Sequence, residues 1–487
     1  MFCGHLNLLL AYFSNKNYFP LRSYLILFND SQITNLKSIS KSIYNLAGYK
    51  AIININIPYK LIDDLFFIVI STILIILFFI GYKAVQSNKI TQSEIIKWGI
   101  VFSVLMTISI PSHSADLYGY IARGAQQSLY NQNPYLEAVS KIKDYHFNPM
   151  FCNFMWQDQP ATYGPVFIFL TKTIVYLSSN NFFISAINFK FLNLTFYLLL
   201  ILFVLKLNQI KDLYLISWNP LILIQGLWNC HNDLISGVFI FFGVYMILKS
   251  KNKNKYFWGM FSLIIAAGIK YVSILVIPLI IFYLLQKKSN GQVLLNIFLG
   301  LCSGLLLTLI FSIDYLSLSR HISIHDFDKL LSNIGLMHKS LIATIFTLVK
   351  YFCKWFEIRC DLNYIQLTLK AFFYSAFVIF YLTRLLRKKT DLAYEITLIL
   401  FIFFGFVLAK FHSWYLLNII VLIPFLEKGM FKNILVALSL SHVYAITFLD
   451  QAKILNYISM TLIPALFVFL KERDKDGSGY KKLKNRI

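Results

Sequence analysis

The chain has 487 residues, of which 58% are hydrophobic and only 14% are charged, with 46 Phe and 30 Tyr. This composition excludes an ordinary soluble multidomain protein. The formal net charge of +23 does not indicate a nucleic-acid partner, because the basic residues lie mostly in short connections between apolar runs and form no single patch. That distribution is typical of cytoplasmic loops of membrane proteins, with attraction to anionic membrane lipid as a second consequence.

Apolar runs of about 17 to 25 residues recur along the chain, a length that crosses the bilayer as a helix. Barrel strands would show short segments of alternating polarity, which these runs lack. We predict an all-α fold, a polytopic helical membrane protein with about 13 transmembrane helices. In chain order the expected spans cover residues 61–82, 95–110, 188–207, 213–228, 234–248, 256–269, 272–285, 293–313, 364–383, 395–409, 414–426, 431–449 and 457–470.

The predicted spans define one domain with two flanking segments. Residues 1–60 form a poorly defined N-terminal segment with no cleavage-site pattern, so we expect no removable signal peptide. Residues 61–470 are expected to form a single membrane domain, because no internal repeat or linker divides them. Residues 471–487 are expected to form a basic cytoplasmic tail.

Four basic clusters, at residues 249–255, 287–288, 384–389 and 471–486, orient the spans. All four should be cytoplasmic, since basic residues concentrate in inner loops. Counting crossings outward from them brings three polar segments to the opposite side, Asn229–Asp233, Lys270–Tyr271 and Lys410–Trp414. The loop of residues 111–162 lies there too if Lys83 and Lys89 are inside.

Two apolar runs, Val166–Leu177 and Ile342–Phe352, would put the basic clusters on alternating sides if both crossed the membrane. We therefore predict that both are surface-lying or re-entrant helices on the outer side. A helix with one polar edge can lie in the plane of the interface.

Asp116 begins a polar stretch just beyond the 95–110 span, which Pro111 terminates. Tyr118, Tyr120 and Arg123 follow it at near-helical spacing. One interpretation is an aspartate that caps an interfacial helix with a tyrosine belt. The other is a general base that activates a hydroxyl group. The spacing alone leaves both open.

The segment Trp156–Pro165 closes the same outer loop, with Gly164 and Pro165 forcing a turn. Its aromatic and acidic side chains are typical of sugar-binding surfaces. An interfacial Trp and Tyr would look the same, so the segment by itself favours neither interpretation.

The segment Trp228–Asp233 places an amide, an imidazole and a carboxylate between two apolar runs. Such groups are costly at membrane depth unless they face a cavity or one another, so we predict a functional site here. A helix cap needs only one of Asn232 and Asp233, which leaves the other polar side chains unexplained. His231 is not expected to bind a metal, because no His or Cys stands at ligand spacing nearby.

Outward basic residues recur at two further interruptions of apolar runs, Lys270-Tyr271 and Lys410-Phe411-His412-Ser413-Trp414-Tyr415. A lysine can snorkel and aromatic residues can mark the interface. Alternatively, a lipid-linked phosphate supplies the anion that these cations lack.

The six cysteines, at positions 3, 152, 230, 302, 353 and 360, include no C-x-x-C pair and no spacing typical of a zinc site. We expect most of them to be small core residues. Cys152 and Cys230 fall on the expected outer side, but the sequence does not establish a pairing.

Seven motifs, taken in order, resemble one family, the polyprenol-phosphate-mannose-dependent mannosyltransferases of the GT-C glycosyltransferase superfamily, in particular the bacterial α-1,6-mannosyltransferase branch. The likeness runs from about residue 95 to 430. The motifs are Asp116-Leu-Tyr118-Gly-Tyr120-Ile-Ala-Arg123-Gly124, Asn133-Pro134-Tyr135, Tyr163-Gly164-Pro165, Asn219-Pro220-Leu221, His231-Asn232-Asp233-Leu234, Lys270-Tyr271 and Trp414-Tyr415-Leu416.

The resemblance implies an inverting hexosyltransferase, with mannose as the sugar, in the bacterial cytoplasmic membrane with its active site facing outward. Its partners would be a polyprenyl-phosphate sugar donor, a glycan or glycolipid acceptor and membrane lipid, with no metal and no cofactor. Asp116 would be the catalytic base, and Lys270 and Arg123 would hold the leaving phosphate. The implied substrate-binding residues are Tyr118, Tyr120, Arg123, Asn133, Tyr135, Tyr163, His231, Asn232, Asp233, Lys270, Tyr271, His412, Trp414 and Tyr415.

The chief alternative is a transporter or flippase of a lipid-linked glycan. Transporters place binding residues near the bilayer midplane and often contain repeated halves, whereas the polar clusters of this chain fall at outer helix ends. A structural membrane protein with interfacial belts is a third option, but it leaves Lys270 and the His231 cluster without a reason.

Overall fold

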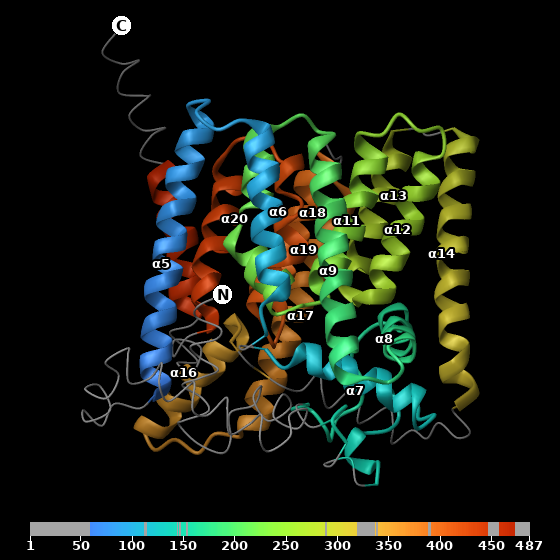
Figure 1. The fold of residues 1–487 in the computed structure, drawn as a ribbon. Helices are drawn as coiled ribbons and strands as arrows, with labels where there is room; N and C mark the ends of the chain where they lie inside the picture. Colours follow the sequence, from blue (N-terminus) through green and yellow to red (C-terminus); the bar gives the residue numbers. More distant parts are fainter. Residues whose placement is uncertain are drawn as a thin grey trace, which may run out of the picture.

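The computed structural model describes residues 59–111, 114–143, 145, 148–151, 154–287, 290–318, 337, 339–387, 391–446 and 457–472. In this part of the chain all regular secondary structure is helical, which confirms the all-α membrane fold (Figure 1). Most of the expected N-terminal segment, most of the basic tail and Cys152 lie outside the described residues.

Four helices are long and apolar enough to cross a membrane. They are α5 (Tyr59–Gln86), α9 (Phe182–Leu205), α14 (Gly291–Leu318) and α17 (Leu362–Leu386). A fifth crossing forms if the π-helical segment η3 (Ile222–Trp228) and α11 (Asp233–Leu248), which meet at an angle of 115°, make one broken span. The other apolar helices described are shorter than 18 residues, so a total of about 13 spans stays a prediction.

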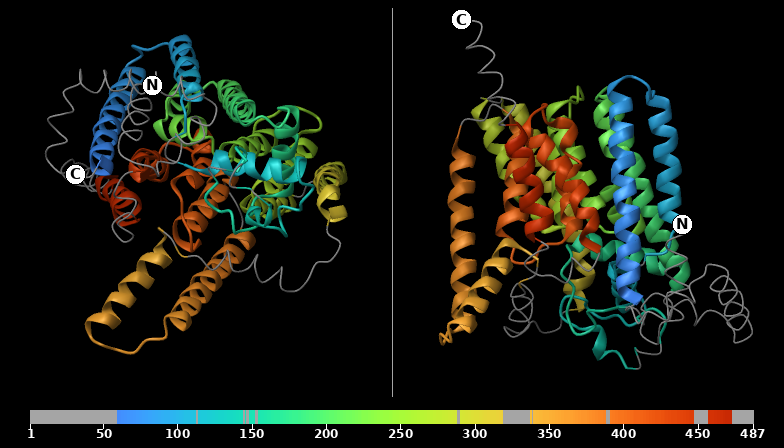
Figure 2. Two further views of the ribbon diagram at one scale, coloured as in Figure 1. Left: turned by 60° about the horizontal axis from the view of Figure 1, so that its bottom comes forward. Right: turned by 90° about the vertical axis from the view of Figure 1, so that its left-hand side faces the viewer.

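The shorter helices fill the bundle between these spans (Figures 1 and 2). They are α6 (Gln92–Ile108), α10 (Ile210–Ser217), α12 (Lys255–Ile269), η4 (Tyr271–Leu275), α13 (Val276–Gln286), α18 (Leu392–Ile402), η5 (Phe403–Val407), η6 (Ser413–Leu416), α19 (Leu417–Ile420), η7 (Ile423–Phe425), α20 (Met430–Ser441), η8 (His442–Ile446) and η10 (Ile458–Leu462).

The two ends of the bundle differ in chemistry. The ends of α11, α13 and α17 that lead into the basic clusters all lie at one end, uppermost in Figure 1. The opposite end carries α7 (Asp116–Ser128), the short helix η1 (Val139–Lys141) and α8 (Pro165–Leu177). This polarity is the one expected from the distribution of basic residues, and it separates the basic clusters from the Asp116 region.

The helices α7 and α8 lie across the bundle axis, and α8 is seen almost end on in Figure 1. The prediction that residues 166–177 do not cross the membrane therefore agrees with the fold. The helix α16 (Leu341–Trp355) is inclined and stays in the same lower half in the views of Figures 1 and 2.

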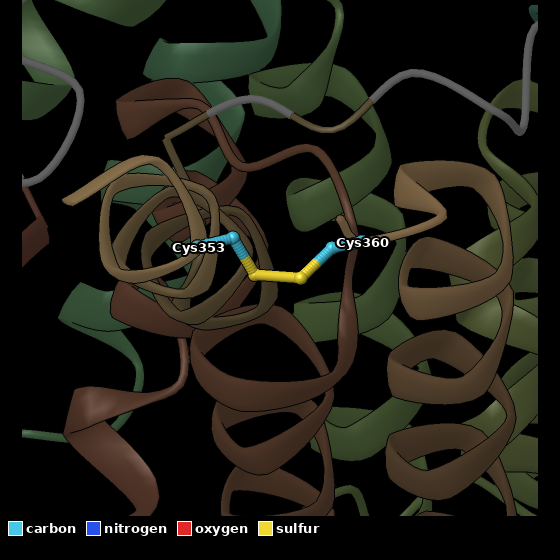
Figure 3. The surroundings of a disulfide bond; sticks show 2 residues. All are labelled: Cys353 and Cys360. Carbon is cyan, nitrogen blue, oxygen red and sulfur yellow. A yellow bond between two sulfur atoms is a disulfide. The ribbon is translucent and has the colours of Figure 1, made fainter. Parts of the chain in front are cut away.

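A disulfide joins Cys353 at the end of α16 to Cys360, just before α17 (Figure 3). The Cα atoms are 6.4 Å apart, within the range for a disulfide. The prediction that most cysteines are small core residues is wrong for this pair, which closes the turn between two helices. Of the outer cysteines considered above, Cys230 is a buried free thiol.

Candidate active site at the outer-loop end

Asp116 is the first residue of α7, but its carboxylate does not cap that helix. The carboxylate oxygen Oδ2 instead lies 3.0 Å from Nδ1 of His231, and both side chains are almost completely buried. The capping interpretation is therefore wrong for the Asp116 side chain, whose carboxylate pairs with His231 instead.

His231 lies in the sharp break between η3 and α11, where Cys230 has a φ of 60°. The imidazole stacks on the ring of Trp414 at 4.0 Å, and His412 stacks on Trp414 at 4.2 Å. Nε2 of His231 has no hydrogen-bond partner among the described residues. Because a buried N–H without an acceptor is costly, we assign the proton to Nδ1, which then donates to Asp116.

Asp233 does not cap α11 through its side chain either. Its carboxylate pairs with the ammonium of Lys270, and Oδ1 also accepts a hydrogen bond of 2.8 Å from Asn418. The ammonium of Lys270 lies 4.3 Å from the ring centre of Tyr415. Asp233 therefore offsets the charge of Lys270 and holds it against an aromatic ring.

A cavity of about 650 Å³ opens beside these pairs. Its polar wall contains one carboxylate and several basic side chains, those of Asp116, Arg123, Lys270, Lys410 and His412. Its apolar wall comes from η4, α17 and η5 and includes Leu275, Tyr374, Phe403, Phe404 and Leu408. The cavity thus offers one acid, a surplus of positive charge and an apolar flank. No cluster of three or more His, Cys, Asp or Glu side chains suited to a metal occurs in the described part of the chain.

Arg123 is only 2% exposed although it borders the cavity. Its guanidinium donates to the side-chain oxygen of Gln126 at 2.8 Å and to the carbonyl of Gln159, and it lies over the ring of Phe154. Burial lowers the pKa of Arg123 to about 10, so the group stays cationic at neutral pH.

The predicted aromatic residues divide into those that line the cavity and those that support it. Tyr163, Tyr271, Trp414 and Tyr415 line it. Tyr135 and Tyr271 donate hydrogen bonds to the carbonyl of Tyr163, at 2.8 and 3.3 Å. The aromatic lining is thus braced by the outer loop.

Tyr118, Tyr120 and Asn133 lie behind the wall. Asn133 accepts a hydrogen bond from the backbone N–H of Tyr135, and the hydroxyl of Tyr120 accepts one from the N–H of Asn232. Tyr118 donates to a backbone carbonyl seven residues earlier. These residues therefore stabilise the outer loop and the break between η3 and α11, which together surround the cavity.

The predicted residues His231, Asn232 and Asp233 are at most 1% exposed and do not line the cavity. Among the residues predicted on the outer side, the three side chains of Asp116, Lys270 and His412 border the cavity. The other two, His231 and Asp233, contact Asp116 and Lys270 from behind. The structure therefore brings all five together in two layers.

The substrate-binding residues predicted from the sequence do not include Lys410 and Asn418. Lys410 belongs to a predicted outward basic segment, and its sequence signal is that of Lys270, a cation between two apolar runs. Asn418 is a single amide within an apolar run, and nothing in its sequence context connects it to Asp233.

The fold and site define a helical membrane protein with a charged cavity at the end opposite its basic loops. Residues 51–286 match the family described as alpha-(1->6)-mannopyranosyltransferase, N-terminal domain. This match confirms the mannosyltransferase resemblance for that part of the chain.

One curated relative is alpha-(1->6)-mannopyranosyltransferase A of Mycobacterium tuberculosis, which is 20% identical over 226 residues. The aligned region covers 43% of this chain and 40% of that relative, so the similarity spans less than half of either protein. No solved structure matches the chain significantly.

Proposed function

We propose that this protein is a membrane glycosyltransferase that moves a mannosyl group from a polyprenyl-phosphate donor to a glycan or glycolipid acceptor outside the cytoplasm. The observation that carries the proposal is the buried Asp116–His231 pair at the wall of a cavity whose other charged groups are cations. The family match supports the same reaction class.

In the proposed reaction, Asp116 is the general base. The acceptor hydroxyl transfers its proton to the Asp116 carboxylate, and its oxygen attacks the anomeric carbon. The bond between that carbon and the phosphate oxygen breaks, and the phosphate leaves with the bonding electrons. His231 keeps the carboxylate oriented through the hydrogen bond from Nδ1.

The basic side chains of the cavity would stabilise the leaving phosphate. Lys270 is already paired with Asp233, and Arg123 already donates to Gln126 and Gln159. Lys410 forms no ion pair among the described residues, although the nearby charge of the Asp116 carboxylate acts on it, and its ammonium lies 5.9 Å from the ring centre of Trp156. We therefore assign the main electrostatic contact with the phosphate to Lys410, with Arg123 and Lys270 in support.

The proposed outward orientation rests on two independent features. The ends of α11, α13 and α17 that lead into three of the basic clusters lie at the end of the bundle opposite the cavity, as expected of cytoplasmic loops. The Cys353–Cys360 disulfide closes the turn between α16 and α17, this turn lies at the cavity end (Figure 2), and disulfides persist in oxidising compartments. Both features favour an extracytoplasmic site.

The test is a transfer assay with the purified, membrane-reconstituted protein, a synthetic polyprenyl-phosphate mannose and an oligomannoside acceptor. Transfer that disappears in Asp116→Asn supports the proposal. Full turnover in a folded Asp116→Asn protein refutes the base assignment, and transbilayer movement of the lipid without an acceptor would favour the transporter alternative instead.

A further inference from the structure

A lysine lies inside the apolar helix α9, where nothing in the proposed chemistry uses it. Lys190 is 7% exposed, and its ammonium donates to three main-chain carbonyls, those of Met106, Ser109 and Trp228. The distances to Met106 and Trp228 are 3.4 and 3.1 Å. An ammonium has three N–H donors, so this arrangement can satisfy all of them. Ionisable groups inside membrane helices are rare and costly, which calls for a specific reason.

The three carbonyls belong to two chain segments that lead into the site. Met106 lies in α6 and Ser109 is its C-cap residue, and the chain then runs to Asp116. Trp228 ends η3, and the chain then runs to His231. A single ammonium therefore ties together the two segments that carry the two partners of the Asp116–His231 hydrogen bond.

A second polar side chain lies one turn further along α9. The amide of Asn193 donates to the carbonyl of Gly226 at 2.8 Å and to the carbonyl of His231 at 3.2 Å. Between these carbonyls, Cys230 has a φ of 60°, a conformation that non-glycine residues adopt only when their surroundings hold it. Asn193 thus holds both sides of the strained turn.

We propose that Lys190 and Asn193 act as positioning residues, a carbonyl clamp that sets the break between η3 and α11 so that His231 meets Asp116. The inference rests on the proposed function for its catalytic consequence, but the clamp itself is a statement about the fold. Neither side chain lines the cavity, so both would act only through the His231 turn.

The test compares Lys190→Met and Asn193→Ala with Lys206→Met, which removes an exposed lysine at the end of the same helix. The first readout needs no activity: site-resolved mass spectrometry of Cys230 alkylation by N-ethylmaleimide in the folded, reconstituted protein. Cys230 is a buried free thiol, and a loosened turn should raise its alkylation rate about tenfold in both clamp variants, while Lys206→Met stays at the wild-type rate.

The second readout is the transfer reaction. We expect kcat to fall about tenfold or more in the clamp variants with an unchanged KM for the donor, and the acidic limb of the pH–kcat profile to shift because the contact with Asp116 is altered. Lys190→Arg, which keeps the charge and the donors, should restore part of the loss. A purely structural role would lower the yield of folded protein but leave kcat per folded molecule and the pH profile unchanged.

If Cys230 is alkylated at the wild-type rate in the folded Lys190→Met and Asn193→Ala proteins, the proposed clamp is wrong. Faster alkylation with unchanged kcat would overturn the positioning role. If the wild-type protein transfers no sugar at all, the alkylation result still decides the clamp, while the proposed function alone fails. Asn193→Ala keeps the test decisive if Lys190→Met does not fold.

Discussion

Oδ2 of Asp116 and Nδ1 of His231 are 3.0 Å apart in space and 115 positions apart in the sequence. The histidine has no exposed surface, and the aspartate borders the cavity. The hydrogen bond with His231 thus fixes the orientation of the carboxylate from the protein interior, and the aspartate still borders the space that a substrate would enter. This is the arrangement that a positioned general base requires.

Replacing Asp116 with Asn should lower kcat by about 10²- to 10⁴-fold, the range that general bases contribute. The amide keeps the size of the carboxylate but cannot accept the acceptor's proton. The rate of mannosyl transfer from a polyprenyl-phosphate donor measures the effect. The matched control is Asp158→Asn, because Asp158 is exposed in the same outer loop. Equal losses in both variants would count against a specific role for Asp116.

Replacing Lys410 with Met should weaken binding of a polyprenyl monophosphate about 10- to 100-fold, because a hydrogen bond to a charged group contributes roughly 1.5–3 kcal/mol. The measurement is the inhibition constant of a synthetic polyprenyl monophosphate in the transfer assay. The uncharged polyprenol should bind both proteins equally. The control is Lys141→Met, which removes an exposed lysine of the outer loop. Unchanged inhibition by the phosphate would remove Lys410 from the phosphate contact.

Cysteines introduced at Asp158 and Lys251 should react with reagents from opposite sides of the membrane. Both positions are exposed, one in the outer loop and one in a basic loop. In a chain whose free cysteines are replaced by serine, we expect an impermeant maleimide to label Asp158→Cys in intact cells and Lys251→Cys only after permeabilisation. The reverse pattern would contradict the outward orientation of the site.

Replacing Gly164 with Ala should destabilise the protein by about 1–3 kcal/mol, the usual cost of overpacking. A Cβ at Gly164 would overlap the carbonyl oxygen of Gly268 near the end of α12, and a backbone atom cannot move aside as the end of a flexible side chain can. Thermal unfolding in nanodiscs, followed by tryptophan fluorescence, measures the change. Gly291→Ala is the control, since a Cβ there meets no atom within 4 Å. Equal unfolding temperatures for Gly164→Ala and the wild type would show that the α8–α12 contact can relax.

Several features of the fold could be predicted because they depend on local composition. The helical membrane class follows from the length of the apolar runs, and the position of α8 at the end opposite the basic loops follows from counting basic clusters. The disulfide between Cys353 and Cys360 could not be predicted in this way. Its seven-residue separation fits a pairing only once the chain between α16 and α17 is known to turn back.

The residues of the candidate site could mostly be predicted from the sequence, but their positions relative to the cavity could be predicted only in part. Outward polar residues at helix ends identified Asp116, Lys270 and His412, which do border the cavity. The same reasoning treated His231 and Asp233 as equivalent to them, although both are buried behind the wall. The sequence shows which residues at helix ends are polar. It does not show which of them face the cavity and which contact one another.

The sequence by itself determined that this chain is a helical membrane protein with polar residues gathered at the helix ends opposite the basic loops, because hydrophobicity and charge distribution act through short stretches of chain. Only the tertiary structure decided that Asp233 forms an ion pair with Lys270 behind the cavity wall, while Lys410 borders the cavity itself. The physical reason is that an ion pair depends on separations of a few ångströms between segments that meet only when the helices pack.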